Sequence, residues 1–243
     1  MEILSQNFAI FTFNRIDDIM CGRYSFTQNP DPALIVKPEG TDIQWQPRYN
    51  LAPSQYAPVI PQRDSRRIHL MRWGLIPHWA NDIKIGFMMI NARAETITEK
   101  AAYRDPIKRS RCLVLADGFY EWKKTASGRQ PYRILMESEK VFYMAGVSDE
   151  WIDPEGKIIH SFSIITTTPN ELMEDIHDRM PAILNKEEGK KWLLARDSEE
   201  VIPLLKPFPS TLMKAYPVSP LVGNVKNDSP DLILPFTPPP TLF

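Results

Sequence analysis

Residues 141–148 have the sequence VFYMAGVS and residues 158–168 have the sequence IIHSFSIITTT, and these two runs decide the fold class. In both, apolar or β-branched residues alternate between turn signals, a pattern typical of β-strands. Three shorter runs share the pattern: Ala57 to Gln62, Cys112 to Ala116 and Pro131 to Met136. The chain is therefore dominated by short, closely spaced strands.

Helical signals are fewer than strand signals. Three segments carry helix-start patterns: Thr96-x-x-Glu99 before a segment that must stop near Pro106, Asn185-x-x-Glu188 before Lys186 to Ala195, and Pro169-Asn170-Glu171 before a turn toward Ile176. Strands and helices do not alternate regularly, which disfavours a parallel α/β fold. We predict a single α+β domain on mostly antiparallel β-sheet, with a barrel-like core and a few short peripheral helices.

Composition limits the class of protein. The 243 residues are 43% hydrophobic and 24% charged, as in a globular chain with a sizeable core. The formal net charge is −1 and the pI is about 6.4, so contact with nucleic acid would need a local basic patch. Two cysteines are too few for a disulfide framework, and no apolar run approaches the roughly 18 residues of a membrane span. We expect a cytoplasmic protein without membrane contact.

Several catalytic motifs are missing from the sequence. It contains no G-x-x-x-x-G-K-[ST] loop, no G-x-G-x-x-G after a strand, no G-x-S-x-G elbow and no H-E-x-x-H helix. Nucleotide hydrolysis, dinucleotide redox chemistry and zinc proteolysis are therefore disfavoured. The histidines share no close metal-ligand spacing with each other or with the cysteines, so we predict no metal.

The pair Met20-Cys21 suggests that Cys21 becomes the amino-terminal residue. A terminal cysteine carries a thiol with a pKa of roughly 8.5 and an α-amine with a pKa of about 7.7–8.0, whereas lysine lies near ~10.4. Roughly a tenth of such an amine is uncharged at neutral pH. Amine and thiol together can capture an aldehyde, because the amine forms an imine and the thiol then closes a five-membered ring.

Residues 1–20 resemble no targeting signal, because Glu2 stands where a secretory signal would be basic and Thr12 interrupts the apolar run. We favour a translation start at Met20, and the alternative is a propeptide removed before Cys21. A third interpretation makes Cys21 an ordinary internal cysteine in a strand. We predict a leader or mis-assigned start over 1–20, a domain over 21–230 and a proline-rich tail over 231–243.

Three segments carry polar and aromatic residues that a core does not need: Asn91 to Glu95, Gly118 to Trp122 and His177 to Pro181. We expect them to be loop-like and to lie at the ends of elements, where a scaffold holds reactive groups. Partial burial of Glu121 would raise its pKa and favour a protonated general acid, and the alternative is a surface glutamate on a strand edge. His177 is either an acid/base group or a capped or solvated residue.

Seven strings, in order along the chain, resemble the SOS-response-associated peptidase (SRAP) family, whose members shield abasic sites in single-stranded DNA. They are Cys21-Gly22-Arg23-Tyr24, Arg48-Tyr49-Asn50-Leu51-Ala52-Pro53, Arg72-Trp73-Gly74-Leu75-Ile76-Pro77-x-Trp79, Asn91-Ala92-Arg93-Ala94-Glu95-Thr96, Ala116-Asp117-Gly118-Phe119-Tyr120-Glu121-Trp122, His177-Asp178-Arg179-Met180-Pro181 and Val222-Gly223-Asn224-Val225-Lys226-Asn227. The sequence departs from the family in the residues ahead of Met20. If these residues were retained, Cys21 would not be the amino-terminal residue and could not react as one.

The resemblance implies a covalent reaction between Cys21 and the ring-opened sugar aldehyde of an abasic site. The product is a thiazolidine crosslink between DNA and protein, formed with no metal or organic cofactor. By the same resemblance, Asn91 orients the terminal residue, Glu121 handles protons during imine formation, and His177 helps to open the sugar hemiacetal and to reverse the adduct. Aldehyde capture needs a neutral nucleophile, a proton donor and a polar orienter, which fits these residue types.

DNA binding by an acidic protein needs arginines for phosphates and platforms for unstacked bases. The predicted DNA-binding residues lie inside the matched strings: Arg23, Asn50, Pro53, Trp79, Arg93 and Arg179. Trp79 has core packing as its alternative, and Trp73 is assigned to the core. Lys108, Arg109 and Arg111 are most simply a solvated basic face.

Three functions stay open from the sequence. The first is crosslinking to abasic sites in single-stranded DNA by a monomeric, nucleoid-associated protein of the DNA damage response, with strand cleavage by β-elimination as an allowed side activity. The second is a peptidase in which Cys21 attacks a peptide bond and removes residues 1–20. The third is a noncatalytic single-strand binding module.

Overall fold

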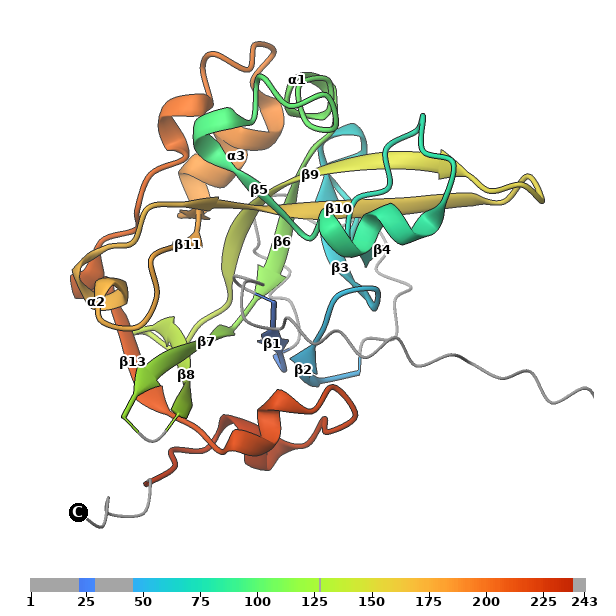
Figure 1. Cartoon of the computed structure of the whole chain (residues 1–243). Coiled ribbons are helices and arrows are strands. Elements are labelled where there is room, and N and C mark those ends of the chain that lie inside the picture. The colour runs from blue at the N-terminus through green and yellow to red at the C-terminus, as the bar shows by residue number, and fades with distance from the viewer. Residues whose placement is uncertain (1–21, 29–45, 127, 238–243) are drawn as a thin grey trace, which may run out of the picture.

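Five strands close into a ring at the centre of the molecule (Figure 1). They are β3 (Tyr56–Pro61), β4 (His69–Trp73), β6 (Arg111–Ala116), β9 (Phe142–Ile152) and β10 (Ile158–Thr167). β3 pairs with β4 and β6, β9 pairs with β6 and β10, and the pair of β10 with β4 closes the ring. Only this last pair is parallel, because an odd number of strands cannot alternate direction around a closed ring. The predicted α+β fold on a mostly antiparallel, barrel-like core is confirmed.

The computed structural model describes residues 22–28, 46–126 and 128–237. A second, antiparallel sheet has the order β13 (Met213–Pro217), β8 (Gly128–Met136), β7 (Gly118–Thr125), β1 (Tyr24–Phe26) and β2 (Arg48–Leu51). Short strands extend the barrel sheet: β5 (Asn91–Arg93), β11 (Met180–Pro181) and β12 (Ile183–Leu184). The α-helices are α1 (Pro106–Arg109), α2 (Glu171–Glu174) and α3 (Lys186–Leu194). The 3₁₀ helices are η2 (Gln62–Asp64), η3 (Ile83–Met88), η4 (Ala94–Thr96), η5 (Ile202–Leu204), η6 (Ser210–Leu212), η7 (Pro220–Gly223) and η8 (Pro230–Ile233).

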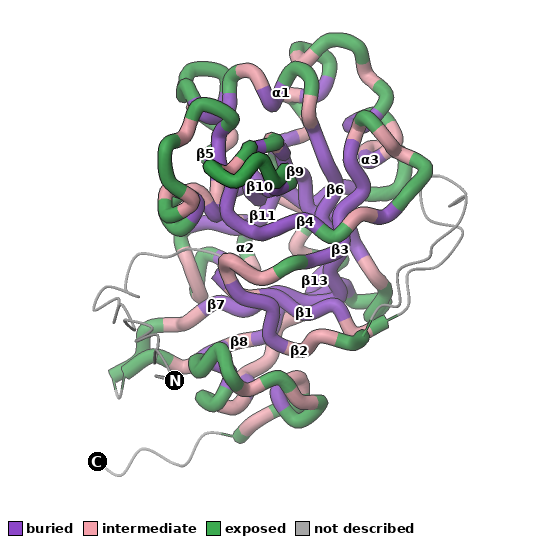
Figure 2. The backbone as a smooth tube through the Cα atoms, turned by 90° about the vertical axis from the view of Figure 1, so that its right-hand side faces the viewer, coloured by how far each residue is buried: buried purple, intermediate pink, exposed green. Residues whose placement is uncertain are grey.

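The barrel strands carry the largest apolar core, as the buried residues in Figure 2 show. Every residue of β6 is buried, so the strand predicted over Cys112 to Ala116 is apolar at every position and does not alternate with polar residues. Leu113, Val114 and Leu115 pack in one cluster with Val147 of β9 and Ile165 of β10. Full burial of each such side chain contributes about 1.5–3 kcal/mol to folding.

The helix predictions succeed where a cap is present. The Asn185 side chain accepts the Glu188 N–H and the Glu188 carboxylate accepts the Asn185 N–H, so the predicted capping box of α3 is confirmed. The Asn170 side chain accepts the Met173 N–H and so caps α2. The helix predicted between Thr96 and Pro106 is wrong, because that segment forms turns and α1 begins at Pro106. Proline suits a first helical position, where its missing N–H would have no partner.

Gly118 to Trp122, predicted to be loop-like, belongs to strand β7, and that prediction is wrong. The segment pairs with β8 on one side and β1 on the other, and Glu121 lies opposite Tyr132 of β8. Its side chains therefore point to alternate faces of the second sheet, with positions set by strand register and not by a loop.

Arg111, predicted to lie on a solvated basic face, is buried, and that prediction is wrong. Its guanidinium donates to the carbonyls of Ile107 at 2.9 Å and Trp192 at 2.6 Å, and also to that of Ala195. These carbonyls lie at the ends of α1 and α3, where helix carbonyls have no partner within the helix. Lys108 and Arg109 are exposed, as predicted.

The chain after β13 lies below β2 in the view of Figure 1. Leu232 is buried there, and Pro235 forms a bridge with Val218, so packing continues past the boundary predicted at residue 230. Residues 1–21, including Cys21, and residues 238–243 of the predicted proline-rich tail lie outside the described residues. Within the described ranges, no helix has the length and apolar character needed to cross a membrane.

Candidate functional site

A pocket of about 360 Å³ gathers several of the predicted site residues. It is lined by Gly22, Arg23, Pro53, Glu121, Trp122, Arg129, Pro131, His177, Pro220 and Gly223. Of these, Arg23, Pro53, Glu121 and His177 were predicted from the sequence, and they come from segments far apart in the chain. Gly22, which follows Cys21 directly in the sequence, also lines the pocket.

Glu121 is the buried carboxylate of this pocket. It is 2% exposed, so the alternative of a surface glutamate is wrong. The neighbouring residues on β7, Tyr120 and Trp122, are buried and partly buried. The hydroxyl of Tyr120 donates to the carbonyl of Tyr49 at 2.6 Å, which ties β7 to β2. The carboxylate is thus held on a strand of a sheet and not on a mobile surface.

His177 faces Glu121, with 3.9 Å between its Nε2 and the Glu121 Oε2. The backbone N–H of His177 donates to the carbonyl of Met173, which extends the turn of α2 and places the imidazole. At the other ring nitrogen, Nδ1 lies 3.2 Å from the Arg179 N–H and 2.9 Å from Asp178 Oδ1. A ring that accepts the Arg179 N–H at Nδ1 carries its proton on Nε2, and this tautomer presents a donor toward Glu121.

Arg23 supplies a positive charge to the pocket lining. Its guanidinium donates to the carbonyl of Val222 at 2.8 Å and to that of Gly223 at 3.2 Å. Burial lowers the pKa of Arg23 to about 10, so the side chain remains positively charged at neutral pH. The pocket therefore combines a cation, a buried carboxylate and an imidazole around the start of the described chain.

Asn50 and Asn91 do not line the pocket. Asn50 is fully buried beneath it, and its Nδ2 lies within 3.1 Å of the carbonyls of Val222, Asn224 and Asn227. Asn91 begins β5, opposite Ile164 of β10, and its carbonyl accepts from the hydroxyl of Tyr103.

The remaining predicted DNA-binding residues lie outside the pocket lining. Arg179 is buried and donates to both carboxylate oxygens of Glu95, at 2.6 and 2.9 Å, and to the carbonyl of Thr166 at 2.8 Å. The hydrogen bond from Arg179 lowers the pKa of Glu95. Arg93 is exposed at the end of β5. Trp79 is 49% exposed, so its core-packing alternative is wrong, whereas Trp73 is buried in the core as predicted.

Sequence reasoning missed six lining residues: Gly22, Trp122, Arg129, Pro131, Pro220 and Gly223. Gly22, Trp122 and Gly223 lie inside the segments that resemble the SRAP family, so the resemblance offered a signal for these three. Arg129 and Pro131 join the site through the register of the β7–β8 hairpin, where Trp122 lies opposite Pro131. A single sequence does not give that register without the fold.

A buried charge pair supports the sheet that carries the pocket. Arg133 of β8 donates to Asp117 Oδ1 at 3.1 Å and to the Tyr216 hydroxyl at 3.0 Å. Burial alone would lower the pKa of Arg133, but the hydrogen bond to Tyr216 and the charge of Asp117 outweigh burial and raise it. Asp117 also accepts from the Ser25 hydroxyl at 2.6 Å, so the pair connects β8 to β1. A side chain at Gly118 would collide with this guanidinium, at 2.6 Å from Nε.

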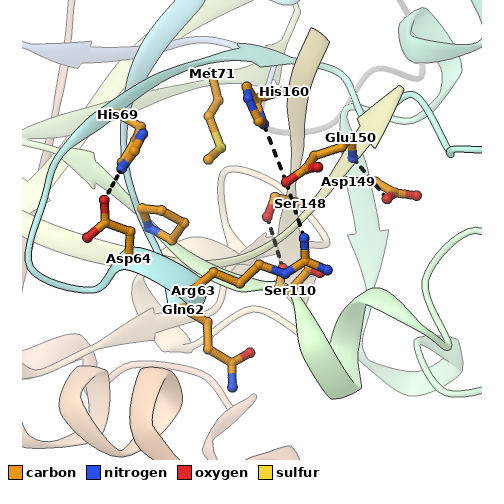
Figure 3. Close-up of a pocket in the computed structure, with 11 residues that line it drawn as sticks. Gln62, Arg63, Asp64, His69, Met71, Ser110, Ser148, Asp149, Glu150 and His160 are labelled. Carbon is orange, nitrogen blue, oxygen red and sulfur yellow. Dashed lines mark hydrogen bonds and ion pairs between the residues drawn. The ribbon is translucent and has the colours of Figure 1, made fainter. Parts of the chain in front are cut away.

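A second pocket, of about 190 Å³, is lined by residues around the end of β3 and the start of β4 and by residues of β9 and β10 (Figure 3). β3 begins shortly after Pro53 of the first pocket and ends at Pro61 of the second. Five ionisable side chains of the second pocket pair with one another: His69 with Asp64 at 2.9 Å, Arg63 with Glu150 at 3.2 Å and His160 with Glu150 at 3.8 Å. In the described part of the chain, no group of three His, Cys, Asp or Glu residues is placed to hold a metal ion.

The fold is an α+β barrel with a pocket that holds a buried carboxylate, an imidazole and an arginine. Comparison with known families then assigns the chain to one of them. The family model described as SOS response associated peptidase (SRAP) matches residues 20–225, so the chain belongs to this family.

The chain is similar to named members of this family and to a solved structure. The chain is 45% identical over 224 residues to the abasic site processing protein YoqW of Bacillus subtilis (strain 168), covering 88% of this chain and 99% of that protein. It is 34% identical over 260 residues to the abasic site processing protein HMCES of Xenopus tropicalis, covering 87% of this chain and 77% of that protein. A crystal structure of a protein from Bacteroides thetaiotaomicron superimposes with a TM-score of 0.78 at 32% identity, covering 89% of this chain and all of the other.

Proposed function

We propose that this protein binds abasic sites in single-stranded DNA and bonds to them covalently through Cys21 as its amino-terminal residue. The observation that carries the proposal is the pocket in which Gly22, the neighbour of Cys21, lies with Glu121, His177 and Arg23. The names of the relatives YoqW and HMCES support abasic DNA as the substrate.

The proposed reaction joins one aldehyde to one cysteine and releases one water. The uncharged α-amine of Cys21 attacks the aldehyde carbon and forms a carbinolamine. Its hydroxyl leaves as water after taking a proton, and an imine remains. The thiol then adds across the C=N bond, with sulfur on carbon and a proton on nitrogen, and closes the thiazolidine ring.

Glu121 and His177 supply the proton transfers of this scheme. Their side chains are 3.9 Å apart, close enough for both to contact one substrate oxygen. His177 presents its Nε2–H and is suited to donate to the sugar ring oxygen as the hemiacetal opens. Glu121 is suited to transfer a proton when the carbinolamine loses water. Asn91 keeps its proposed role in orienting the terminal residue.

The DNA strand approaches through positive and aromatic side chains around the pocket. Arg23 and Arg129 line the pocket, and Arg93 is exposed beyond it, so these three are the proposed phosphate contacts. Trp79 is exposed and available for base stacking, with Pro53 as a wedge at the pocket edge. Because Asn50 and Arg179 are buried, we assign them a supporting role beneath the strand.

The test is the intact mass of the purified protein before and after incubation with a single-stranded oligonucleotide that carries one abasic site. We expect protein that begins at Cys21 to gain the oligonucleotide mass less one water. Full-length protein without adduct calls for the same measurement on protein started at Met20. Absence of adduct there would contradict the proposal.

The family description also names a peptidase, and a noncatalytic binding module is the remaining alternative. Cys21→Ser separates the three functions. Thiazolidine formation should vanish, peptidase activity should fall, and plain DNA binding should survive. The cytoplasmic location, the monomeric state, the role in DNA damage and any β-elimination activity stay predictions.

A further inference from the structure

The pocket has a wall that comes from the far end of the chain. Residues 219–228, here called the wall segment, contribute Pro220 and Gly223 to the lining. Within residues 219–231, Val222 is the one buried residue, and it packs in a small cluster with Tyr120, Val218 and Leu232. Because one buried apolar side chain contributes little free energy, polar contacts must fix the position of this segment.

Those polar contacts meet at β2, the strand beside β1. Asp228 Oδ1 accepts from the backbone N–H groups of Tyr49 at 2.6 Å and Asn50 at 3.1 Å, and Asp228 Oδ2 pairs with Arg48. In return, the buried Asn50 amide donates to wall-segment carbonyls, including that of Val222 at 3.1 Å. Contacts therefore run in both directions between β2 and the wall segment.

Arg23 extends this connection toward Cys21. Its guanidinium is held by the carbonyls of Val222 and Gly223 in the wall segment, almost two hundred positions away in the chain. Arg23 is separated from Cys21 by Gly22 alone. The wall segment therefore holds a side chain that stands two positions after Cys21 in the sequence.

We infer that Asp228 and Asn50 are positioning residues for the crosslinking reaction. They hold the wall segment against β2, the wall segment holds Arg23, and Arg23 sets the geometry of the terminal cysteine relative to Glu121 and His177. This inference rests on the proposed function. It assigns the wall segment a larger effect on reaction rate than on DNA affinity, because Arg23 is one of three proposed phosphate contacts.

The test compares Asp228→Ala with Asp231→Ala, an exposed aspartate a few residues further along. Protein that begins at Cys21 is used to measure the single-turnover crosslinking rate at saturating abasic oligonucleotide. Affinity is measured with the same oligonucleotide carrying tetrahydrofuran, which has no aldehyde. We expect Asp228→Ala to lower the rate about 10- to 100-fold and to change Kd less than about threefold, because small displacements of reacting groups cost rate. Asp231→Ala should match the parent protein.

A graded variant distinguishes positioning from general damage. Asp228→Asn keeps an oxygen for the two backbone N–H groups, so it should recover most of the lost rate. Hydrogen exchange of residues 22–28 should be faster in Asp228→Ala than in Asp231→Ala. Unchanged rate and exchange in Asp228→Ala would overturn the inference, as would an equal loss of rate and affinity. If the parent protein forms no adduct, the proposed function fails, and exchange alone then decides whether the wall segment holds the amino-terminal strand.

Discussion

The two pockets both gather ionisable side chains, yet they differ in how those groups are held. Around the second pocket, Arg63, Asp64, His69, Glu150 and His160 have side chains that are 38–62% exposed. In the first pocket Glu121 is nearly inaccessible to solvent.

Solvent exposure determines how strongly a charged side chain interacts with its neighbours. Water screens the pairs of the second pocket, so their mutual attraction is weak. In the first pocket a buried carboxylate near an imidazole interacts strongly with whatever enters, because the local dielectric constant is low. The comparison shows that burial, more than the number of titratable residues, sets how strongly a cluster of charges can act on a bound molecule.

The largest expected difference between the pockets is in reaction rate. Glu121→Gln should lower the single-turnover crosslinking rate about 10²- to 10⁴-fold, because a glutamine cannot transfer a proton. Glu150→Gln is the matched control in the second pocket and should leave the rate unchanged. Equal rates for the two variants would remove Glu121 from the mechanism. The measurement is adduct formation followed by gel or intact mass.

The next largest effect is on stability beneath the first pocket. Asp117→Asn should lower the free energy of unfolding by about 3–5 kcal/mol, because it leaves Arg133 as a buried charge without its carboxylate. Asp64→Asn removes an exposed carboxylate near the second pocket and should cost less than about 1 kcal/mol. Urea unfolding of both variants gives the comparison. A similar cost for the two would show that the burial difference has no energetic consequence.

A smaller effect with a distinct pH dependence is expected at Glu95. Its pKa is lowered in the folded protein by Arg179, so the carboxylate contributes stability above its ordinary pKa of about 4.3 and loses that contribution as pH falls through the folded value. Glu95→Gln should therefore destabilise the protein at pH 7 by about 1 kcal/mol, a figure reduced for the partial exposure of Glu95. The difference from the parent protein should shrink in unfolding curves recorded below pH 4. A constant difference across pH would refute the assignment.

The smallest effect is expected in the second pocket itself. Glu150→Gln removes the partner of Arg63 and His160 and should change the free energy of unfolding by less than about 1 kcal/mol. Added salt should make the change smaller still, because screening weakens exposed pairs. A large loss that salt does not reduce would show that this pocket is more tightly coupled to the barrel than its exposure indicates.

Local patterns predicted the parts of the fold that depend on neighbouring residues. The run Cys112 to Ala116 lies within β6, and the capping box at Asn185 opens α3, because each signal acts within a few positions of the chain. The same reasoning failed at Thr96, where tight turns replaced a helix, and at Arg111, whose guanidinium is buried between two helix ends. Those outcomes depend on residues that are distant in sequence.

By itself the sequence determined the strand-rich α+β class, the family strings and the identity of Glu121, His177 and Arg23 as site candidates, because strand periodicity and short motifs are properties of adjacent residues. Only the tertiary structure decided that Glu121 is buried, that His177 faces it and that Val222 and Gly223 hold Arg23. Burial and pairing depend on which residues surround a side chain. Those neighbours are distant in sequence, and strand pairing brings them together only in the folded protein.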